Sequence, residues 1–296
     1  MRSYVVLVCL SVVMFLGQMS YADDDPSKEV ETLIERTLKN MVFVEGGAFM
    51  MGDSEEEMIA AFGDMAFYYY LPCRDNRPAH KVVLNDYYLS KYEITFGGHD
   101  LYSAIAQLEP ALPGEVGNPW RGGPDHPARV SWAQANDYCA WLGEQTGLPF
   151  ALPTEAQWEF AARSRGKVVP FATDTGYVER GVNYPESAYW PGPVGQFPPN
   201  PLGLHDMSGN VHEWVADFYD PDYYSRSPVD NPQGPQSGES KVYRGGGTGN
   251  SPGGSSTIIR GEGRYTEEYS RAGFRCVINT SEPLPIHELA TENNIQ

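Results

Sequence analysis

The second half of the chain, residues 166 to 281, is rich in Gly, Pro, Asn and Tyr and contains no internal repeat. Gly and Pro interrupt regular elements, so we expect strands here of no more than about five or six residues. A layered α/β architecture needs a regular alternation of strands and helices, and this half lacks it. The sequence therefore predicts a single, irregular α+β domain with many loops.

Two helices have clear start signals. A hydroxyl residue stands three positions before a glutamine in each, Ser131 before Gln134 and Thr154 before Gln157, and such a capping box satisfies backbone N–H groups at a helix N-terminus. Gly147 follows the first helix as a stop signal. The apolar spacing predicts the buried faces: Trp132, Ala135, Tyr138, Cys139 and Leu142 in the first helix, and Trp158, Ala161 and Ala162 in the second.

The region before these helices predicts a further helix and several strands. Residues 27 to 40 show one apolar face, with Ser27 as the N-cap. Residues 41–44, followed by two glycines, are typical of a strand and a tight turn. Segments 81–84 and 87–90 alternate like the paired strands of a hairpin. Residues 53–79 are predicted to form a surface insertion.

The first 22 residues are typical of an export signal. Arg2 gives a basic start, residues 5–16 form an apolar run too short to span a bilayer, and Ser20-Tyr21-Ala22 is a small-x-small cleavage site. A membrane anchor is the alternative interpretation of this run. We expect cleavage, no membrane span afterwards, and a periplasmic or secreted protein.

The formal net charge of −18 constrains the partners. It repels nucleic-acid phosphates and anionic lipid headgroups, so nucleic-acid and membrane-surface roles are disfavoured. Cleavage would leave Cys73, Cys139 and Cys276 in the chain. In an oxidising compartment an odd count favours one disulfide and one remaining thiol, but spacing alone does not choose the pair.

Several sequence blocks occur in a fixed order between residues 41 and 278. They are MVFVEGGAFMMG at 41–52, KYEIT at 91–95, PARVSW at 127–132, LPTEAQWE at 152–159, GLHDMSGNVHEW at 203–214, RGG at 244–246 and GFRC at 273–276. Together they resemble the formylglycine-generating-enzyme, or sulfatase-modifying-factor, domain family. The resemblance implies a C-type-lectin-like fold with little regular structure. It predicts a domain over residues 41–281, preceded by a helical lead-in at 23–40 and followed by a tail at 282–296.

The resemblance also implies a calcium site in the loop from Asp206 to Glu213. Calcium takes six to eight oxygen ligands, and a tight loop offers carboxylates together with backbone carbonyls. The predicted ligands are the side chains of Asp206 and Glu213 and the carbonyls of Met207, Gly209 and Val211. The alternative is a turn whose acids bind only backbone donors. A second family site begins at Asn183 and Tyr184, but the following loop, 185–195, lacks the expected aspartate.

The same comparison pairs Cys139 with Cys276 and shows what the chain lacks. Oxidising members bind copper through two cysteines placed shortly after the Gly-Gly turn, because copper(I) prefers soft thiolates. The matching positions here are Asn250 and Ser255, and residues 245–255 contain no cysteine. Formylglycine generation through copper is therefore not expected.

Three functions remain compatible with these residues. The chain resembles pyoverdine-maturation members, which also lack the cysteine pair and sit in the periplasm. In such a tailoring enzyme, acting on a protein or small molecule, His212 could serve as general base and Arg264 or Arg271 could hold an anionic substrate group. The alternative is a catalytically silent, calcium-stabilised binding module. The third possibility is the formylglycine-generating oxidase itself.

Overall fold

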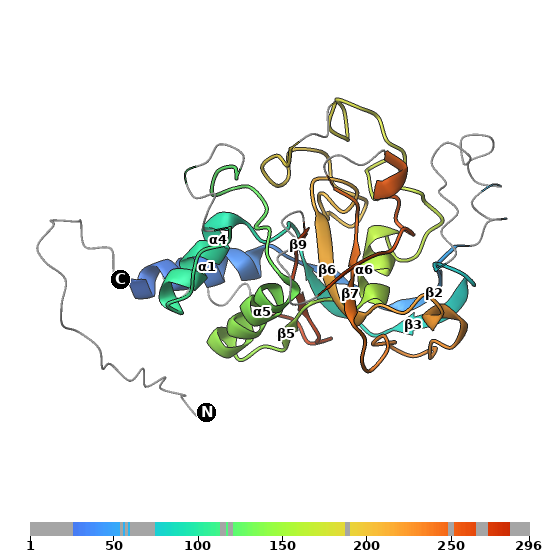
Figure 1. The fold of residues 1–296 in the computed structure, drawn as a ribbon, viewed down its shortest axis with the longest axis horizontal. Helices are drawn as coiled ribbons and strands as arrows, with labels where there is room; N and C mark the ends of the chain where they lie inside the picture. The colour runs from blue at the N-terminus through green and yellow to red at the C-terminus, as the bar shows by residue number, and fades with distance from the viewer. Residues whose placement is uncertain are drawn as a thin grey trace, which may run out of the picture.

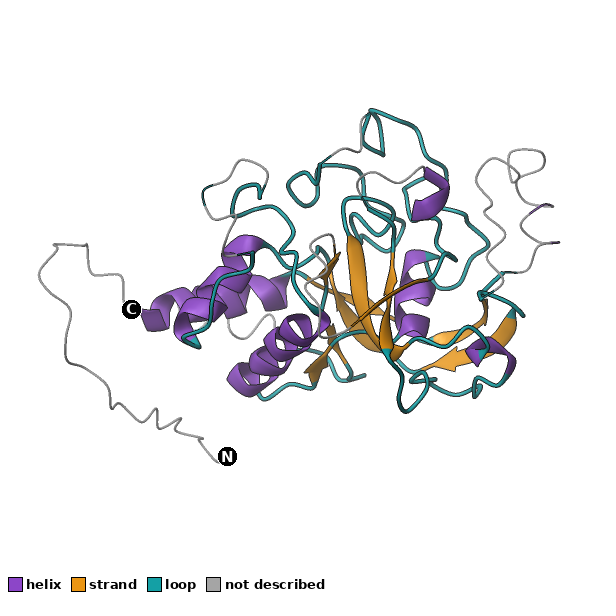
Figure 2. Ribbon diagram, viewed as in Figure 1, coloured by secondary structure: helices purple, strands orange, loops and turns teal. Residues whose placement is uncertain are grey.

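The computed structural model describes residues 26–53, 56, 59, 75–112, 117, 121–186, 190–247, 252–264 and 272–284. Its helices are α1 (Pro26–Lys39), α4 (Phe96–Ile105), α5 (Trp132–Thr146), α6 (Glu155–Ala162) and the short 3-10 helices η2 (Tyr223–Ser225) and η3 (Pro252–Ser255). Its strands are β1 (Met41–Val44), β2 (Gly47–Met51), β3 (His80–Leu84), β4 (Tyr87–Ser90), β5 (Phe150–Ala151), β6 (His212–Phe218), β7 (Ser240–Arg244), β8 (Gly261–Arg264), β9 (Ala272–Phe274) and β10 (Val277–Ile278). Short strands and long loops dominate (Figure 2), which confirms the α+β expectation.

Some predictions concern residues outside this description: the export signal at 1–22, Cys73, Asn250, Arg271 and most of the tail after residue 281. Among the described residues, no helix is long and apolar enough to cross a membrane.

The two helices predicted from capping boxes form as expected. Ser131 accepts from the Gln134 backbone N–H and Thr154 from that of Gln157, and both glutamine side chains return a bond to the cap residue. Helix α1 begins at Pro26, one residue before the predicted cap Ser27, because proline suits the first helical position. The sequence interpretation missed α4, whose N-cap is Thr95. Two glycines in its first turn lower the helix propensity there.

The predicted hairpin of segments 81–84 and 87–90 is wrong. Strand β3 pairs with β2 and strand β4 pairs with β1, both antiparallel. The register is the same on both sides of the break, so residues 41–51 and 80–90 form one long ladder that bends in the middle. Gly46 is required at this bend, since a Cβ there would lie 2.3 Å from the Leu84 carbonyl oxygen. Its N–H donates to the Asp86 side chain at 2.7 Å.

The strands form two four-stranded sheets, in the orders β1-β4-β10-β5 and β8-β7-β6-β9, and the pair β2-β3. Helices α1, α4 and α5 lie at one end of the molecule, whereas α6 lies next to β6 and β7 and the β2-β3 pair lies at the other end (Figure 1). Strand β6 separates two hydrophobic cores. Trp214 belongs to the core formed with α1, α4 and α5, and the next residue, Val215, belongs to the core formed with α6, β2 and β3. Successive strand residues point to opposite faces, so β6 is buried on both sides.

A disulfide joins Cys139 in α5 to Cys276 beside β10, which confirms the predicted pair. The bond closes a loop with a sequence separation of 137 residues. A cross-link of that length constrains the unfolded chain and contributes roughly 4–5 kcal/mol in the chain-entropy model. Both cysteines are fully buried, so the bond lies inside the first core.

A buried network of three arginines and two glutamates ties α6 to β7 and to the segment before β8. We call it the arginine–glutamate network; its members are Glu155, Glu159, Arg163, Arg244 and Arg260. Arg244 binds Glu155 at 2.6 Å and Glu159 at 2.8 Å, and Arg260 binds Glu155 at 2.7 Å. Arg163 binds Glu159 at 3.0 Å. Burial raises the pKa of Glu155, but Arg260 and Arg244 outweigh burial and hold that pKa below its usual value.

Candidate functional site

The loop from Asp206 to Val211 leads into β6 and carries the predicted calcium ligands. Asp206, Gly209 and Asn210 all have positive φ, at 61°, 115° and 57°. Two of these are not glycine, and an L side chain in this region costs conformational free energy that the surroundings must offset. The loop is held by the Gly209 N–H, which donates to the Gly245 carbonyl at 2.8 Å. The Gly195 N–H donates to the Asp206 carboxylate at 2.6 Å.

Three carboxyl groups influence one another beneath this loop, and we call them the acidic cluster: Glu93, Asp206 and Glu213. Glu93 accepts from the Asn210 amide at 2.7 Å. Burial, together with the charges of Asp206 and Glu213, raises the pKa of Glu93 well above its usual value. Burial also raises the pKa of Asp206 to about 6. The cluster is therefore short of positive charge.

The one cation bound directly to the acidic cluster among the described residues is Arg275. Its Nη2 donates to Glu213 Oε1 and its Nε to Glu213 Oε2, both at 2.7 Å. The Trp158 indole N–H donates to the same Oε2 at 2.8 Å. Glu213 lies in β6 and is fully buried. Both of its oxygens are thus already hydrogen-bonded.

The acidic cluster offers carboxylates for a cation, but one of them already has other partners. Burial is the main cause of the raised pKa values of Glu93 and Asp206, and neighbouring carboxylates add to it; a nearby divalent cation would lower both pKa values. The carbonyls of Met207, Gly209 and Val211 belong to the same tight loop. Glu213, however, is committed to Arg275 and Trp158. No group of three or more His, Cys, Asp or Glu side chains in the described part of the chain is arranged to hold a metal.

The second predicted calcium position is occupied by internal hydrogen bonds. The Asn183 side chain accepts from the Glu179 N–H at 2.7 Å and donates to Asp174 at 2.8 Å and to the Tyr177 carbonyl at 3.0 Å. Tyr184 is buried, and its hydroxyl lies 3.1 Å from Ser255 Oγ. Asn183 therefore organises its own loop.

Ser255, the predicted counterpart of a copper-binding cysteine, is fully buried in η3. Gly246 lies directly against it, because a Cβ on Gly246 would be 2.4 Å from Ser255 Oγ. The side chain is therefore enclosed by Gly246 and Tyr184. Asn250, the predicted counterpart of the other copper-binding cysteine, lies outside the described residues.

His212 is the first residue of β6 and is half-buried. Its ring centroid lies 4.6 Å from that of Tyr243. Gly247 is beside it, since a Cβ there would lie 3.2 Å from His212 Cδ2. His212 also pairs with Ala272 in the parallel ladder between β6 and β9. The structure thus places this histidine next to the Gly-rich turn that carries the cysteines in the oxidising members.

The structure does not bring Arg264 to His212. Arg264 is exposed and pairs with Ser240 at the start of β7, whereas β6 residues next to His212 pair with the other end of β7, where Glu213 lies opposite Arg244. Four residues of extended strand separate these ends, roughly 13 Å. Strand register therefore keeps the backbone of Arg264 apart from that of His212. Arg271 lies outside the described residues.

Glu93, Arg275 and Trp158 take part in the site but were not predicted as site residues. A sequence signal existed for two of them. Glu93 stands between Tyr92 and Ile94, and Arg275 stands between Phe274 and Cys276. A charged residue inside an apolar run is buried only when it is paired, so each of these marks a buried polar interaction.

Comparison with known proteins decides the family. The model of the sulfatase-modifying factor enzyme 1-like domain matches residues 26–280. The chain belongs to this family. The match includes helix α1 as well as the region predicted from residue 41 onward.

The chain is similar to most of one known protein and to a smaller part of another. It is 28% identical over 266 residues to the formylglycine-generating enzyme of Streptomyces coelicolor, covering 71% of this chain and 79% of that protein. It is 30% identical over 234 residues to the serine/threonine-protein kinase pkn1 of Chlamydia pneumoniae, covering 71% of this chain. The match spans only about a third of that kinase, 33% of its length.

The solved structure of PvdO from Pseudomonas aeruginosa has the same fold. Its TM-score is 0.66 at 27% identity, and the match covers 80% of this chain and 93% of PvdO. The family and the fold predicted from the sequence blocks are therefore confirmed.

Proposed function

We propose that the chain is an exported member of the sulfatase-modifying factor family that tailors a protein or small-molecule substrate without a copper-binding cysteine pair. The sequence has four cysteines, at positions 9, 73, 139 and 276. The disulfide uses Cys139 and Cys276. Two neighbouring thiols are therefore not available at the position where oxidising members use them, and we expect no tight copper(I) binding.

The observation that carries this proposal is the placement of His212. A half-buried imidazole beside the Gly-rich turn can accept a proton from a bound substrate. Tyr243 packs against the ring and restricts its orientation. Arg271 directly precedes Ala272, the residue that pairs with His212, and remains our candidate for holding an anionic substrate group.

The test compares His212→Gln with a matched control, His205→Gln. His205 is also half-buried, but its Nδ1 lies 2.8 Å from the Phe197 carbonyl oxygen. His212, in contrast, lies beside Gly247 of the Gly-rich turn. A deletion strain is complemented with each variant, and its exported peptides and small molecules are compared by mass spectrometry. We expect a product that forms with wild type and His205→Gln and falls by about 100-fold with His212→Gln, the usual scale for losing a general base. Full complementation by His212→Gln would refute its catalytic role.

A binding module is the second candidate, and the burial of Ser255 favours it. Ser255, which matches a cysteine position of the oxidising members, is buried against Tyr184 and cannot be reached by a substrate. Such burial is compatible with a domain that keeps the fold and catalyses no reaction at this position. In that case no product would depend on His212, and His212→Gln would complement as well as wild type.

We further propose that calcium stabilises the Asp206 loop. The three neighbouring carboxyl groups of the acidic cluster, with Arg275 as their one directly bound cation among the described residues, support this proposal. A chelator should lower the melting temperature of the wild-type protein, and added calcium should restore it. Asp206→Asn should abolish this response, whereas Asp222→Asn, a change at an exposed acid of a different loop, should preserve it. A melting temperature that ignores both chelator and calcium would argue against the site.

Export is tested by N-terminal sequencing of the protein recovered from the periplasm or the medium. We expect a new N-terminus after Ala22. An intact N-terminus on membrane-associated protein would favour the anchor instead.

A further inference from the structure

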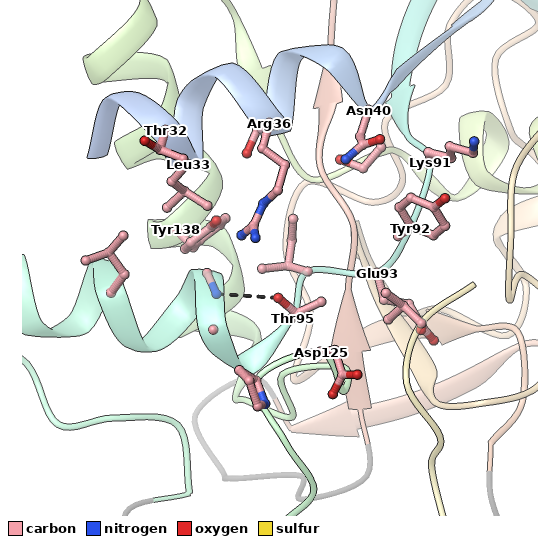
Figure 3. A pocket seen from close by; sticks show the side chains of 18 of the residues that line it. Thr32, Leu33, Arg36, Asn40, Lys91, Tyr92, Glu93, Thr95, Asp125 and Tyr138 are labelled. Atoms are coloured by element: carbon pink, nitrogen blue, oxygen red, sulfur yellow. Dashed lines mark hydrogen bonds between the residues drawn. The ribbon is translucent and has the colours of Figure 1, made fainter. Parts of the chain in front are cut away.

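A cavity of about 790 Å³ is lined in part by Glu93, a member of the acidic cluster. Helix α1 forms one wall, and the others are the segment Ser90–Thr95, the first turns of α4 and residues 124–125 (Figure 3). The volume falls in the range of pockets that hold small organic molecules, about 300–1,000 Å³. None of the residues predicted to form the active or calcium site lines it.

The cavity has an apolar wall. Leu33 from α1, Ile94, Leu101 from α4 and Val194 all line it. Burial of an apolar ligand against these side chains is favourable, roughly in proportion to the area removed from water. The body of the ligand is therefore expected to be apolar.

A buried polar group faces the same space. Tyr138 lines the cavity, is fully buried, and its hydroxyl has no hydrogen-bond partner among the described residues. A buried hydroxyl without a partner is costly, so a native structure that retains one invites a ligand or a water molecule to bind it. The hydroxyl packs closely against Gly98, because a Cβ there would lie 3.2 Å from the tyrosine oxygen.

Arg36 supplies a positive charge at the same end. Its side chain points from α1 into the cavity toward Tyr138 (Figure 3), and its charge acts on the tyrosine hydroxyl. Lys28 and Lys91 line the cavity as well. Neither Arg36 nor Lys28 forms an ion pair with any residue that the structure describes.

Two of the acids around the cavity are hydrogen-bonded to other residues. Glu93 accepts from Asn210 at 2.7 Å and Asp125 lies 2.9 Å from the His126 ring nitrogen. The remaining acid in the lining is Glu29, which is exposed on the first turn of α1. The described lining thus holds three basic and three acidic residues, and of these Arg36 is the one whose charge acts on the Tyr138 hydroxyl.

We propose that this cavity binds a small organic carboxylate with an apolar body. Its carboxylate accepts hydrogen bonds from the Arg36 guanidinium and the Tyr138 hydroxyl, and its body lies against Leu33, Ile94 and Leu101. A guanidinium presents a fork of donors that matches a carboxylate, and a phenol adds a third donor. The site is independent of His212 and of the proposed tailoring reaction.

The experiment titrates the full chain with decanoate, with decanol as the uncharged match and decylamine as the opposite charge, by calorimetry. We expect saturable one-to-one binding of decanoate and at least about tenfold weaker binding of the other two, the usual scale for a charge-assisted hydrogen bond. Equal binding of decanol, or no saturable binding of decanoate at millimolar concentration, would overturn the proposal. So would binding of a short peptide with a free C-terminal leucine carboxylate in the absence of decanoate binding.

Three variants locate the carboxylate. Arg36→Gln should weaken decanoate binding about tenfold and leave decanol binding unchanged. Lys39→Gln is the matched control, because Lys39 lies on the same helix, pairs with Glu35 and does not line the cavity. Tyr138→Phe should weaken decanoate binding several-fold while the melting temperature of the ligand-free protein stays the same or rises, since the change removes an unsatisfied group. Equal effects of Arg36→Gln and Lys39→Gln would refute the assignment.

Discussion

The arginine–glutamate network and the acidic cluster are both buried, yet they handle charge in opposite ways. The first sets two glutamates against three arginines, and its central pKa, that of Glu155, is lowered by the guanidiniums despite burial. The second sets three carboxyl groups against Arg275 alone, and the pKa values of Glu93 and Asp206 are raised. One region is complete within the protein. Among the described residues, the other has three carboxyl groups and one directly bound cation.

The difference separates scaffold from site. Paired charges that satisfy one another rigidify α6, β7 and the residues before β8, and removal of one partner would leave the others uncompensated. Buried carboxyl groups that repel one another destabilise the fold, and such groups are retained where a cation or a ligand offsets the repulsion. Trp158 joins the two regions, because it belongs to α6 and donates to Glu213.

The largest expected effect comes from breaking the complete region. Arg244→Met would leave Glu155 and Glu159 buried without their shared partner and should lower the free energy of unfolding by about 3–5 kcal/mol. Urea denaturation followed by tryptophan fluorescence measures this. A loss below about 1 kcal/mol would show that Arg260 and Arg163 suffice to neutralise the two glutamates.

The incomplete region should respond with the opposite sign. In chelator at pH 7, Asp206→Asn should raise the free energy of unfolding by about 1–3 kcal/mol, because it removes a buried ionised carboxylate that also repels Glu213. An asparagine oxygen can still accept from the Gly195 N–H. The same urea titration compares the variant with wild type, and a destabilised variant would mean that the acidic cluster is already neutralised.

The pH dependence sharpens the comparison further. The folded pKa of Asp206, about 6, lies above the ordinary 3.8 expected in the unfolded chain. Between these values the folded state binds more protons, so the stability of calcium-free wild type should fall as pH rises from about 4 to about 6. The advantage of Asp206→Asn should therefore disappear below about pH 4. Unfolding curves at a series of pH values test this, and an advantage independent of pH would rule out titration as its cause.

The smallest effect should come from an exposed ion pair. Arg226 and Asp220 pair at the surface, where water screens the attraction. Arg226→Met should change the free energy of unfolding by less than about 1 kcal/mol in the same assay. A loss as large as that of Arg244→Met would show that burial is not what distinguishes the network.

Local signals in the sequence predicted the local structure well. Helices α5 and α6 begin where their capping boxes stand, because Ser131 and Thr154 meet their glutamines within one turn. The Cys139–Cys276 pair came from family resemblance, and spacing alone left it open. Helix α4 escaped detection because Gly97 and Gly98 weaken its first turn.

Contacts between distant segments could not be predicted in the same way. The partner of β3 is β2, about thirty residues earlier, and no pattern within β3 specifies it. The sequence suggested Arg264 as a partner of His212 because it is a basic residue in the same part of the chain. The register of β7 with β6 and β8 instead places the two residues toward opposite ends of β7. Arg36 and Tyr138 come together only through the packing of α1 against α5. Periodicity describes which face of a helix is buried but not which neighbour covers it.

Strand β4 has one further consequence. It pairs on one side with β1, the first described strand, and on the other with β10, the last. The first and the last described strands are thus both hydrogen-bonded to the same central strand, β4. Deleting residues from either extremity should loosen the other, so shortened versions of this protein that omit β1 or β10 should unfold throughout rather than fray at the cut.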